Sequence, residues 1–171
     1  LSICAAAARP APGQERTELR VSRATVAPRV DGVLDDQAWL GEPLPLGAWI
    51  SYDPVRGDAA PDRTDVRVTY DDRFIYFAFH CQAADPAAVR TTLSKRDTVF
   101  NDDWVGFSLD STGSRQTSYH FMVNASGVQM DAVNTTASGE KFESDFVWYS
   151  AGARTADGYI VELALPLETL R

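Results

Sequence analysis

The stretch DDWVGFSLDSTGSRQTSYHFMVNASGVQMDAV, residues 102–133, decides the fold of this chain. It holds three runs in which apolar and polar residues alternate, at 104–110, 118–123 and 128–132, with polar turn residues between them. Successive side chains of a β-strand point to opposite faces, so a period of two indicates strands. The stretch therefore predicts three antiparallel strands that bury one face.

The register of these strands is predicted from their apolar side chains, because a slip of one residue would turn those side chains to solvent. Phe107 is expected opposite Phe121, and Phe121 opposite Met130. The second turn is expected to close with Val123 opposite Val128. The other face is then polar, with a glycine hollow at its centre, and we expect a ligand there. That face carries Trp104, Gly106, Ser108, His120, Met122, Asn124, Gln129 and Asp131.

The composition is that of a globular domain without affinity for nucleic acid. The chain has 171 residues, of which 44% are hydrophobic and 11% aromatic, which is enough for one domain with a core. Its net charge is −8, and nucleic-acid phosphates require basic partners, so nucleic acid is excluded. No apolar run has the length needed to cross a membrane.

The first residues, LSICAAAARP, are similar to the tail of a secretory signal peptide. A disordered alanine-rich leader is the alternative. We expect a signal-peptide remnant and disordered leader over 1–14 and a single β-sandwich domain over 15–171. The expected location is the periplasm, the outer membrane or the extracellular space of a Gram-negative bacterium. Removal of Cys4 with the signal would leave Cys81 unpaired, and we expect Cys81 to be reduced and buried.

Short strands at even spacing predict an all-β fold, an antiparallel two-sheet β-sandwich of immunoglobulin or jelly-roll type with one or two short helices. In the run 74–81 both the even-numbered and the odd-numbered residues are mostly apolar, which predicts a central strand covered on both faces. Asp35 is the expected N-cap of a short helix that carries Trp39 into the core. Further strands are expected at 19–27, 66–70, 146–149 (with Trp148) and 159–165, and helical turns within 85–95 and from 167.

Four stretches in this order resemble the family 9 carbohydrate-binding module and its relatives in bacterial exported proteins. They are VDGVLDDQAW at 30–39, TYDDRFIY at 69–76, NDDWV at 101–105 and GYIVELALP at 158–166. The resemblance covers 30–171 and implies a two-sheet sandwich, often with calcium, and sugar recognition between two tryptophans. The chain is also similar to the amino-terminal part of large exported proteins whose later region looks like an outer-membrane barrel. The tryptophan pair cannot be placed residue by residue in this sequence.

Candidate ligand-binding residues follow from how proteins hold sugars, by stacking aromatic rings on them and by bonding their hydroxyls with planar polar groups. The stacking candidates are Trp104, Trp49 and Trp148, and for Trp148 a core position remains open. The candidate partners of hydroxyl groups are Asn124, Gln129, Asp131 and His120. An alternative is that His120 simply pairs with Asp131 across the strands.

Loop carboxylates are the candidate metal ligands, because calcium takes six to eight oxygen ligands. The candidates are Asp71, Asp72, Asp102 and Asp103, and the alternative is that these residues only form turns. No haem is expected. His120 and Met122 are neighbours on one strand face, whereas two axial ligands must lie on opposite sides of the iron.

The sequence therefore predicts a non-catalytic exported module that binds an oligosaccharide or polysaccharide in support of carbohydrate catabolism. No GxSxG motif occurs, and no pair of carboxylates stands out as a glycosidase pair. The alternative is a structural or docking domain of a larger outer-membrane-associated protein, whose carboxy-terminal part covers the polar face.

Overall fold

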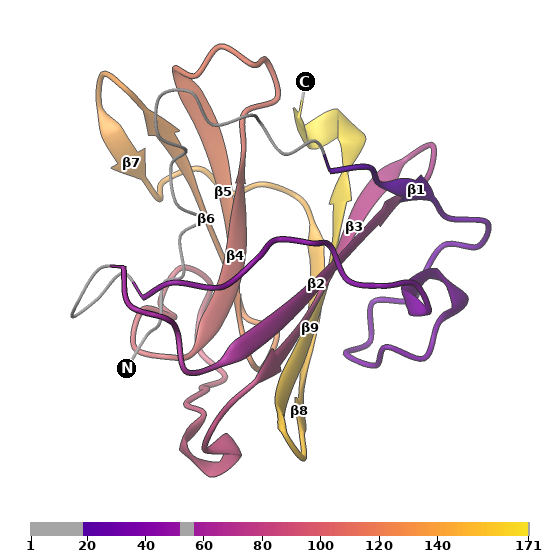
Figure 1. Cartoon of the computed structure of the whole chain (residues 1–171). Coiled ribbons are helices and arrows are strands. Elements are labelled where there is room, and N and C mark those ends of the chain that lie inside the picture. Colours follow the sequence, from indigo (N-terminus) through magenta and orange to yellow (C-terminus); the bar gives the residue numbers. More distant parts are fainter. Residues whose placement is uncertain (1–18, 52–56, 171) are drawn as a thin grey trace.

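A computed structural model describes residues 19–51 and 57–170 of the chain. Within these residues it has nine strands and three short 3-10 helices (Figure 1). The strands are β1 (Ser22–Arg23), β2 (Arg63–Tyr70), β3 (Phe74–Gln82), β4 (Trp104–Leu109), β5 (Thr117–Asn124), β6 (Gln129–Thr135), β7 (Gly139–Lys141), β8 (Tyr149–Thr155) and β9 (Gly158–Pro166). The helices are η1 (Gln37–Trp39), η2 (Pro86–Ala88) and η3 (Leu167–Leu170). The predicted leader at 1–14 lies outside the described residues.

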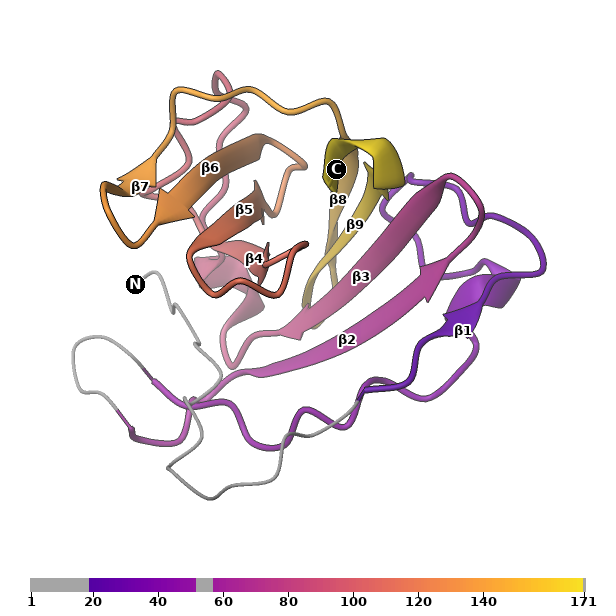
Figure 2. The ribbon, with the colours of Figure 1, turned by 90° about the horizontal axis from the view of Figure 1, so that it is seen from above.

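The strands form two sheets, which confirms the predicted sandwich. One sheet has the order β1-β2-β3-β9-β8 and the other the order β4-β5-β6-β7 (Figure 2). The main core lies between them, where the rings of Phe77 on β3 and Phe107 on β4 stack at a centroid distance of 3.8 Å. None of the helices in the described part of the chain has the length and apolar character needed to cross a bilayer.

Strand β3 lies at the centre of its sheet and is covered on both faces, as predicted. Phe77 and Phe79 point into the main core. Tyr76 and Ala78 point to the other side, where the segment 30–39 covers the sheet and Trp39 is buried as expected. The short helix there begins after Asp36 rather than Asp35, and the Asp36 side chain does not cap it.

The register of β4 with β5 is the predicted one, with Phe107 opposite Phe121. The predicted register of β5 with β6 is wrong by one residue, because Phe121 pairs with Asp131 and Met122 with Met130. The cause is the turn: Asn124 Oδ1 accepts the backbone N–H groups of Ser126 and Val128 at 3.0 and 2.8 Å, so β6 starts one residue later.

This register turns Asp131 into the sandwich and Met130 out of it. Met130 is nonetheless buried, because Val99 and Phe142 cover this end of the outer face. The expected glycine hollow is absent. A Cβ atom on Gly106 would lie 2.7 Å from the Cγ atom of Met122, whose side chain fills the space.

The strand expected within 19–27 is present as the short β1, which lies at the edge of its sheet and runs parallel to β2. Another expectation meets a different outcome. Trp148, expected inside a strand, precedes β8, which begins at Tyr149. The Trp148 side chain points into the main core, and the side chain of the next residue, Tyr149, faces out.

Candidate functional site

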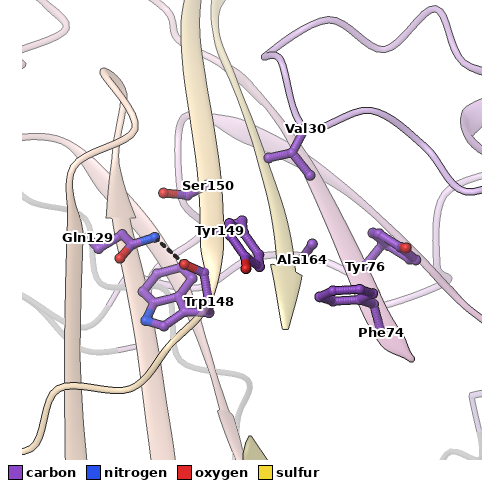
Figure 3. A pocket seen from close by; sticks show the side chains of 8 residues that line it. All are labelled: Val30, Phe74, Tyr76, Gln129, Trp148, Tyr149, Ser150 and Ala164. Carbon is purple, nitrogen blue, oxygen red and sulfur yellow. Dashed lines mark hydrogen bonds between the residues drawn. The ribbon is translucent and has the colours of Figure 1, made fainter. Parts of the chain in front are cut away.

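A hollow of about 480 Å³ opens where β8 begins, at the margin between the two sheets (Figure 3). We call it the aromatic hollow. Its lining comes from the segment before η1, from four strands and from the residue that precedes β8. The residues are Val30, Phe74, Tyr76, Gln129, Trp148, Tyr149, Ser150 and Ala164. Two of the seven predicted ligand residues, Gln129 and Trp148, are among them.

The strand register explains why this part of the sheet is hollow. Tyr149 on β8 pairs with Ala164 on β9, and Ala164 pairs with Tyr76 on β3. Directly opposed residues point to the same face of a sheet. A single methyl group therefore lies between two tyrosine rings (Figure 3), and the buried Ala164 forms the floor of the hollow.

Tyr149 is the accessible aromatic side chain of the hollow, with 53% of its surface exposed. Its ring meets the ring of Phe74 edge-on, at a centroid distance of 6.1 Å. Phe74 in turn lies 5.8 Å from the ring of Tyr76. The three rings form a continuous aromatic wall, and a ring face that stays open to solvent can stack on a ligand.

Tyr76 is held in place by Asp71, in the turn between β2 and β3. The Tyr76 hydroxyl donates to Asp71 Oδ2 at 2.8 Å, while Asp71 Oδ1 accepts the backbone N–H groups of Arg73 and Phe74. Burial acts to raise the pKa of Asp71, but these hydrogen bonds outweigh it and the pKa lies below its ordinary value. The 69–76 motif therefore builds one wall of the hollow.

The opposite wall is polar and consists of Gln129 and the main chain of Trp148. Gln129 Nε2 donates to the carbonyl oxygen of Trp148 at 3.0 Å, which is the bond drawn in Figure 3. Gln129 Oε1 accepts from Arg96 at 2.5 Å. The Trp148 ring itself is buried, and its Nε1 donates to Asp131 Oδ2 at 2.7 Å.

The remaining predicted ligand residues lie elsewhere. Asn124 is fully buried, and its amide bonds Thr92, Asp102 and the following turn. Trp104 is half-buried and packs against the small cluster of Val99, Met122 and Met130. The structure therefore does not gather the predicted residues on one polar face.

His120 and Trp49 are also engaged within the protein. His120 Nδ1 lies 2.7 Å from Glu140, so its expected alternative partner Asp131 is the wrong one. Trp49 Nε1 donates to the carbonyl oxygen of Thr64 at 2.8 Å, and its ring packs on the main core.

The four candidate calcium ligands do not converge. Asp71 holds Tyr76, Asp72 pairs with Arg23 at 2.5 Å, Asp102 bonds Thr92 and Asn124, and Asp103 accepts from the backbone of Arg90. Among the described residues, no group of three or more His, Cys, Asp or Glu side chains has the arrangement of a metal site. Calcium binding stays a prediction, and a fall in melting temperature on chelation would test it.

Sequence reasoning missed Tyr149, Phe74, Tyr76 and Ala164 as site residues. The pattern does show that Phe74 and Tyr76 share one phase of β3, opposite to the core phase. No sequence pattern indicates which residues surround Tyr149. Its neighbours depend on the pairing of β8 with β9 and on the residue at which β8 begins.

Comparison with known proteins identifies the family. The model of the family described as "Carbohydrate family 9 binding domain-like" matches residues 30–171. The chain belongs to this family. No curated protein matches it. A solved structure that it resembles is a carbohydrate-binding module of family 9 from Caldicellulosiruptor kristjanssonii in complex with cellotriose, with a TM-score of 0.54 and 20% sequence identity. The match covers 86% of this chain and 66% of that one, and it shows a shared fold.

Proposed function

We propose that this family 9-like domain binds carbohydrate as a non-catalytic module and that the aromatic hollow is its binding site. The observation that carries the proposal is the exposed ring of Tyr149 beside the small Ala164, in a wall continued by Phe74 and Tyr76. Membership in a carbohydrate-binding family supports the ligand class.

The chemistry of the hollow suits a sugar ring. The faces of a pyranose carry C–H groups that pack on an aromatic ring, and its edge carries hydroxyls that need hydrogen bonds. The Tyr149 side chain offers both the ring face and a hydroxyl group, whereas the Ser150 hydroxyl already donates to the carbonyl oxygen of Gly127 at 2.8 Å. A hollow with an open mouth also admits one end or one segment of a longer chain.

We infer that the ligand is an oligosaccharide or polysaccharide met outside the cytoplasm and that binding supports its catabolism. The acidic net charge of −8 is compatible with an exported domain and unsuited to a polyanionic ligand. The cellotriose bound by the family 9 module of Caldicellulosiruptor kristjanssonii makes cellotriose the first probe.

A calorimetric panel of neutral oligosaccharides, including cellotriose, tests this function. At least one sugar should bind to the wild-type domain, and Ala164→Leu should abolish that binding by filling the floor of the hollow. Overpacking costs about 1–3 kcal/mol, so the unfolding curve of the variant is recorded. If it unfolds without cooperativity, Ala164→Val repeats the test.

Two outcomes would overturn the proposal. Undiminished binding to a folded Ala164 variant would place the site elsewhere. Absence of binding across the panel would favour the docking-domain alternative, in which the surface is covered by another part of a larger protein. Co-purification of this domain with such a part, in a complex that sugars do not dissociate, would then support that alternative.

A further inference from the structure

A closed ring of hydrogen bonds lies behind the polar wall of the aromatic hollow. Gln129 accepts from Arg96, Arg96 donates to Asp131, Asp131 accepts from the indole of Trp148, and the carbonyl of Trp148 accepts from Gln129. The ring joins β6 to the segment before β8 and to the loop before β4. Four side chains therefore restrain one another at the edge of the proposed sugar site.

The ring fixes which way the amide of Gln129 faces. A guanidinium group only donates and a carbonyl oxygen only accepts, so Oε1 must face Arg96 and Nε2 must face Trp148. Each of these contacts uses one of the two bonds that the atom can make. One N–H and one lone pair of Gln129 remain, on a side chain that is half-buried and lines the hollow.

The supports of Gln129 are themselves rigid. Asp131 is fully buried, and its charge is matched by Arg96, which also donates to the carbonyl oxygen of Phe146 at 2.8 Å. The guanidinium of Arg96 lies 5.8 Å from the ring centroid of Trp148. Polar groups that are fixed before a ligand arrives lose less conformational entropy on binding than mobile ones.

We propose that Gln129 is the hydroxyl-recognising residue of the aromatic hollow, and that Arg96 and Asp131 are its positioning residues. The ligand feature is a pair of sugar hydroxyls, one that accepts the free N–H and one that donates to the free lone pair. The proposal rests on the proposed function, because it needs a sugar ring placed against Tyr149. It assigns specificity to the polar wall and affinity to the aromatic wall.

Deoxy sugars combined with a shape-conserving variant test this assignment. The best-bound oligosaccharide and its monodeoxy analogues are titrated into wild type and into Gln129→Met, which keeps the side-chain length and removes the amide. In wild type, loss of the recognised hydroxyl should lower affinity about tenfold, the contribution of one net hydrogen bond. Gln129→Met should bind the parent sugar about tenfold more weakly than wild type does. This variant should bind the same deoxy analogue and the parent sugar with equal affinity.

The matched control is Gln116→Met, which removes a glutamine amide from the exposed turn between β4 and β5. It should leave every affinity at the wild-type value. A Gln129→Met variant that still discriminates against each deoxy analogue as wild type does would overturn the assignment, with the proposed function intact. A wild-type domain that binds no sugar would overturn both.

The positioning role has its own readout. Asp131→Asn keeps an acceptor for the Trp148 indole but removes the buried one of the three carboxylates that pair with Arg96, the others being Asp145 and Asp97. It should shift the indole N–H resonance of Trp148 and reduce discrimination among the deoxy sugars, while the contribution of Tyr149 to affinity stays. Unchanged discrimination in this variant would overturn the positioning role, and an Arg96→Lys variant tests the same point if Asp131→Asn does not fold.

Discussion

The indole Nε1 of Trp39 donates a hydrogen bond of 2.7 Å to Oε1 of Glu162, a fully buried carboxylate on β9, the strand between β3 and β8. The other oxygen of Glu162 accepts the backbone N–H groups of Asp31, Gly32 and Val33 at 3.0, 2.7 and 3.2 Å. The motifs at 30–39 and 158–166 therefore meet at one carboxylate. Gly32 adopts a φ of 84°, which a side chain would strain.

Glu162→Ala should destabilise the domain by about 3 kcal/mol or more, because it leaves the buried N–H groups of Gly32 and of the Trp39 indole without their partner. Burial raises the pKa of Glu162, and the hydrogen bonds from Asp31, Gly32 and Trp39 offset part of this rise. Urea unfolding measures the change. The exposed Glu42→Ala is the control and should change stability little. Equal urea midpoints for Glu162→Ala and Glu42→Ala would show that the hydrogen bonds of Glu162 do not stabilise the fold.

Stability should fall in acid through Asp102. Burial acts to raise its pKa, but hydrogen bonds from Asn124 and Thr92 outweigh burial and lower the pKa below the ordinary value of 3.8. A lowered folded-state pKa contributes stability that is complete above the unfolded value and is lost as pH falls through the folded value. The unfolding free energy of wild type should therefore decline below pH 4 more steeply than that of Asp102→Asn. Parallel curves of unfolding free energy against pH for wild type and Asp102→Asn would contradict this expectation. The control is Asp58→Asn, at an exposed position.

Trp104→Ala should cost stability and spare sugar binding. Its half-buried ring covers Val99, Met122 and Met130 on the outer face of the four-stranded sheet. Removal of a partly buried ring should lower the unfolding free energy by about 2 kcal/mol. Lost sugar affinity at an unchanged melting temperature would instead place recognition on this face, where the sequence pattern predicted it.

Cys81 should react with a thiol reagent only when the domain unfolds. It is buried in the main core, and burial raises its pKa to about 12 despite hydrogen bonds from Tyr159 and Thr64. The thiolate is the reactive form, so almost none exists at neutral pH. A Cys4→Ser variant isolates this thiol, and its labelling rate with and without denaturant is the measurement. Fast labelling of the native domain would contradict the burial.

Much of the fold follows from the sequence because its signals are local. The alternation of apolar and polar residues predicted the strands of the meander, and the run 74–81, apolar on both faces, predicted the central strand β3. The register of β4 with β5 followed from Phe107 and Phe121. The register of β5 with β6 did not, because the side chain of Asn124 forms the turn and because Arg96 and Trp148 allow Asp131 to be buried. The contacts of Arg96 and Trp148 with Asp131 join segments that are far apart in the chain, and the Asn124 turn is a local contact that the alternation of apolar and polar residues does not reveal.

The site was less predictable for the same reason. The search for tryptophan platforms selected Trp148 and Trp49, whose indole N–H groups bond within the protein, to Asp131 and to the carbonyl oxygen of Thr64. The exposed ring is Tyr149. Its ring lies opposite the small Ala164 of β9. The alternation of apolar and polar residues along the chain does not reveal this pairing or the residue at which β8 begins.

Titration of the best-bound oligosaccharide into wild type, Tyr149→Ala and Tyr70→Ala is the most direct measurement. Tyr70 is an exposed tyrosine outside the aromatic hollow, with 39% of its surface accessible, and it serves as the matched control. Loss of the stacking ring should weaken binding by about 2 kcal/mol, or roughly thirtyfold. Tyr149→Ala should show this loss at an unchanged melting temperature, and Tyr70→Ala should bind as wild type does. Equal affinities for wild type and Tyr149→Ala would contradict the assignment of the aromatic hollow as the sugar site.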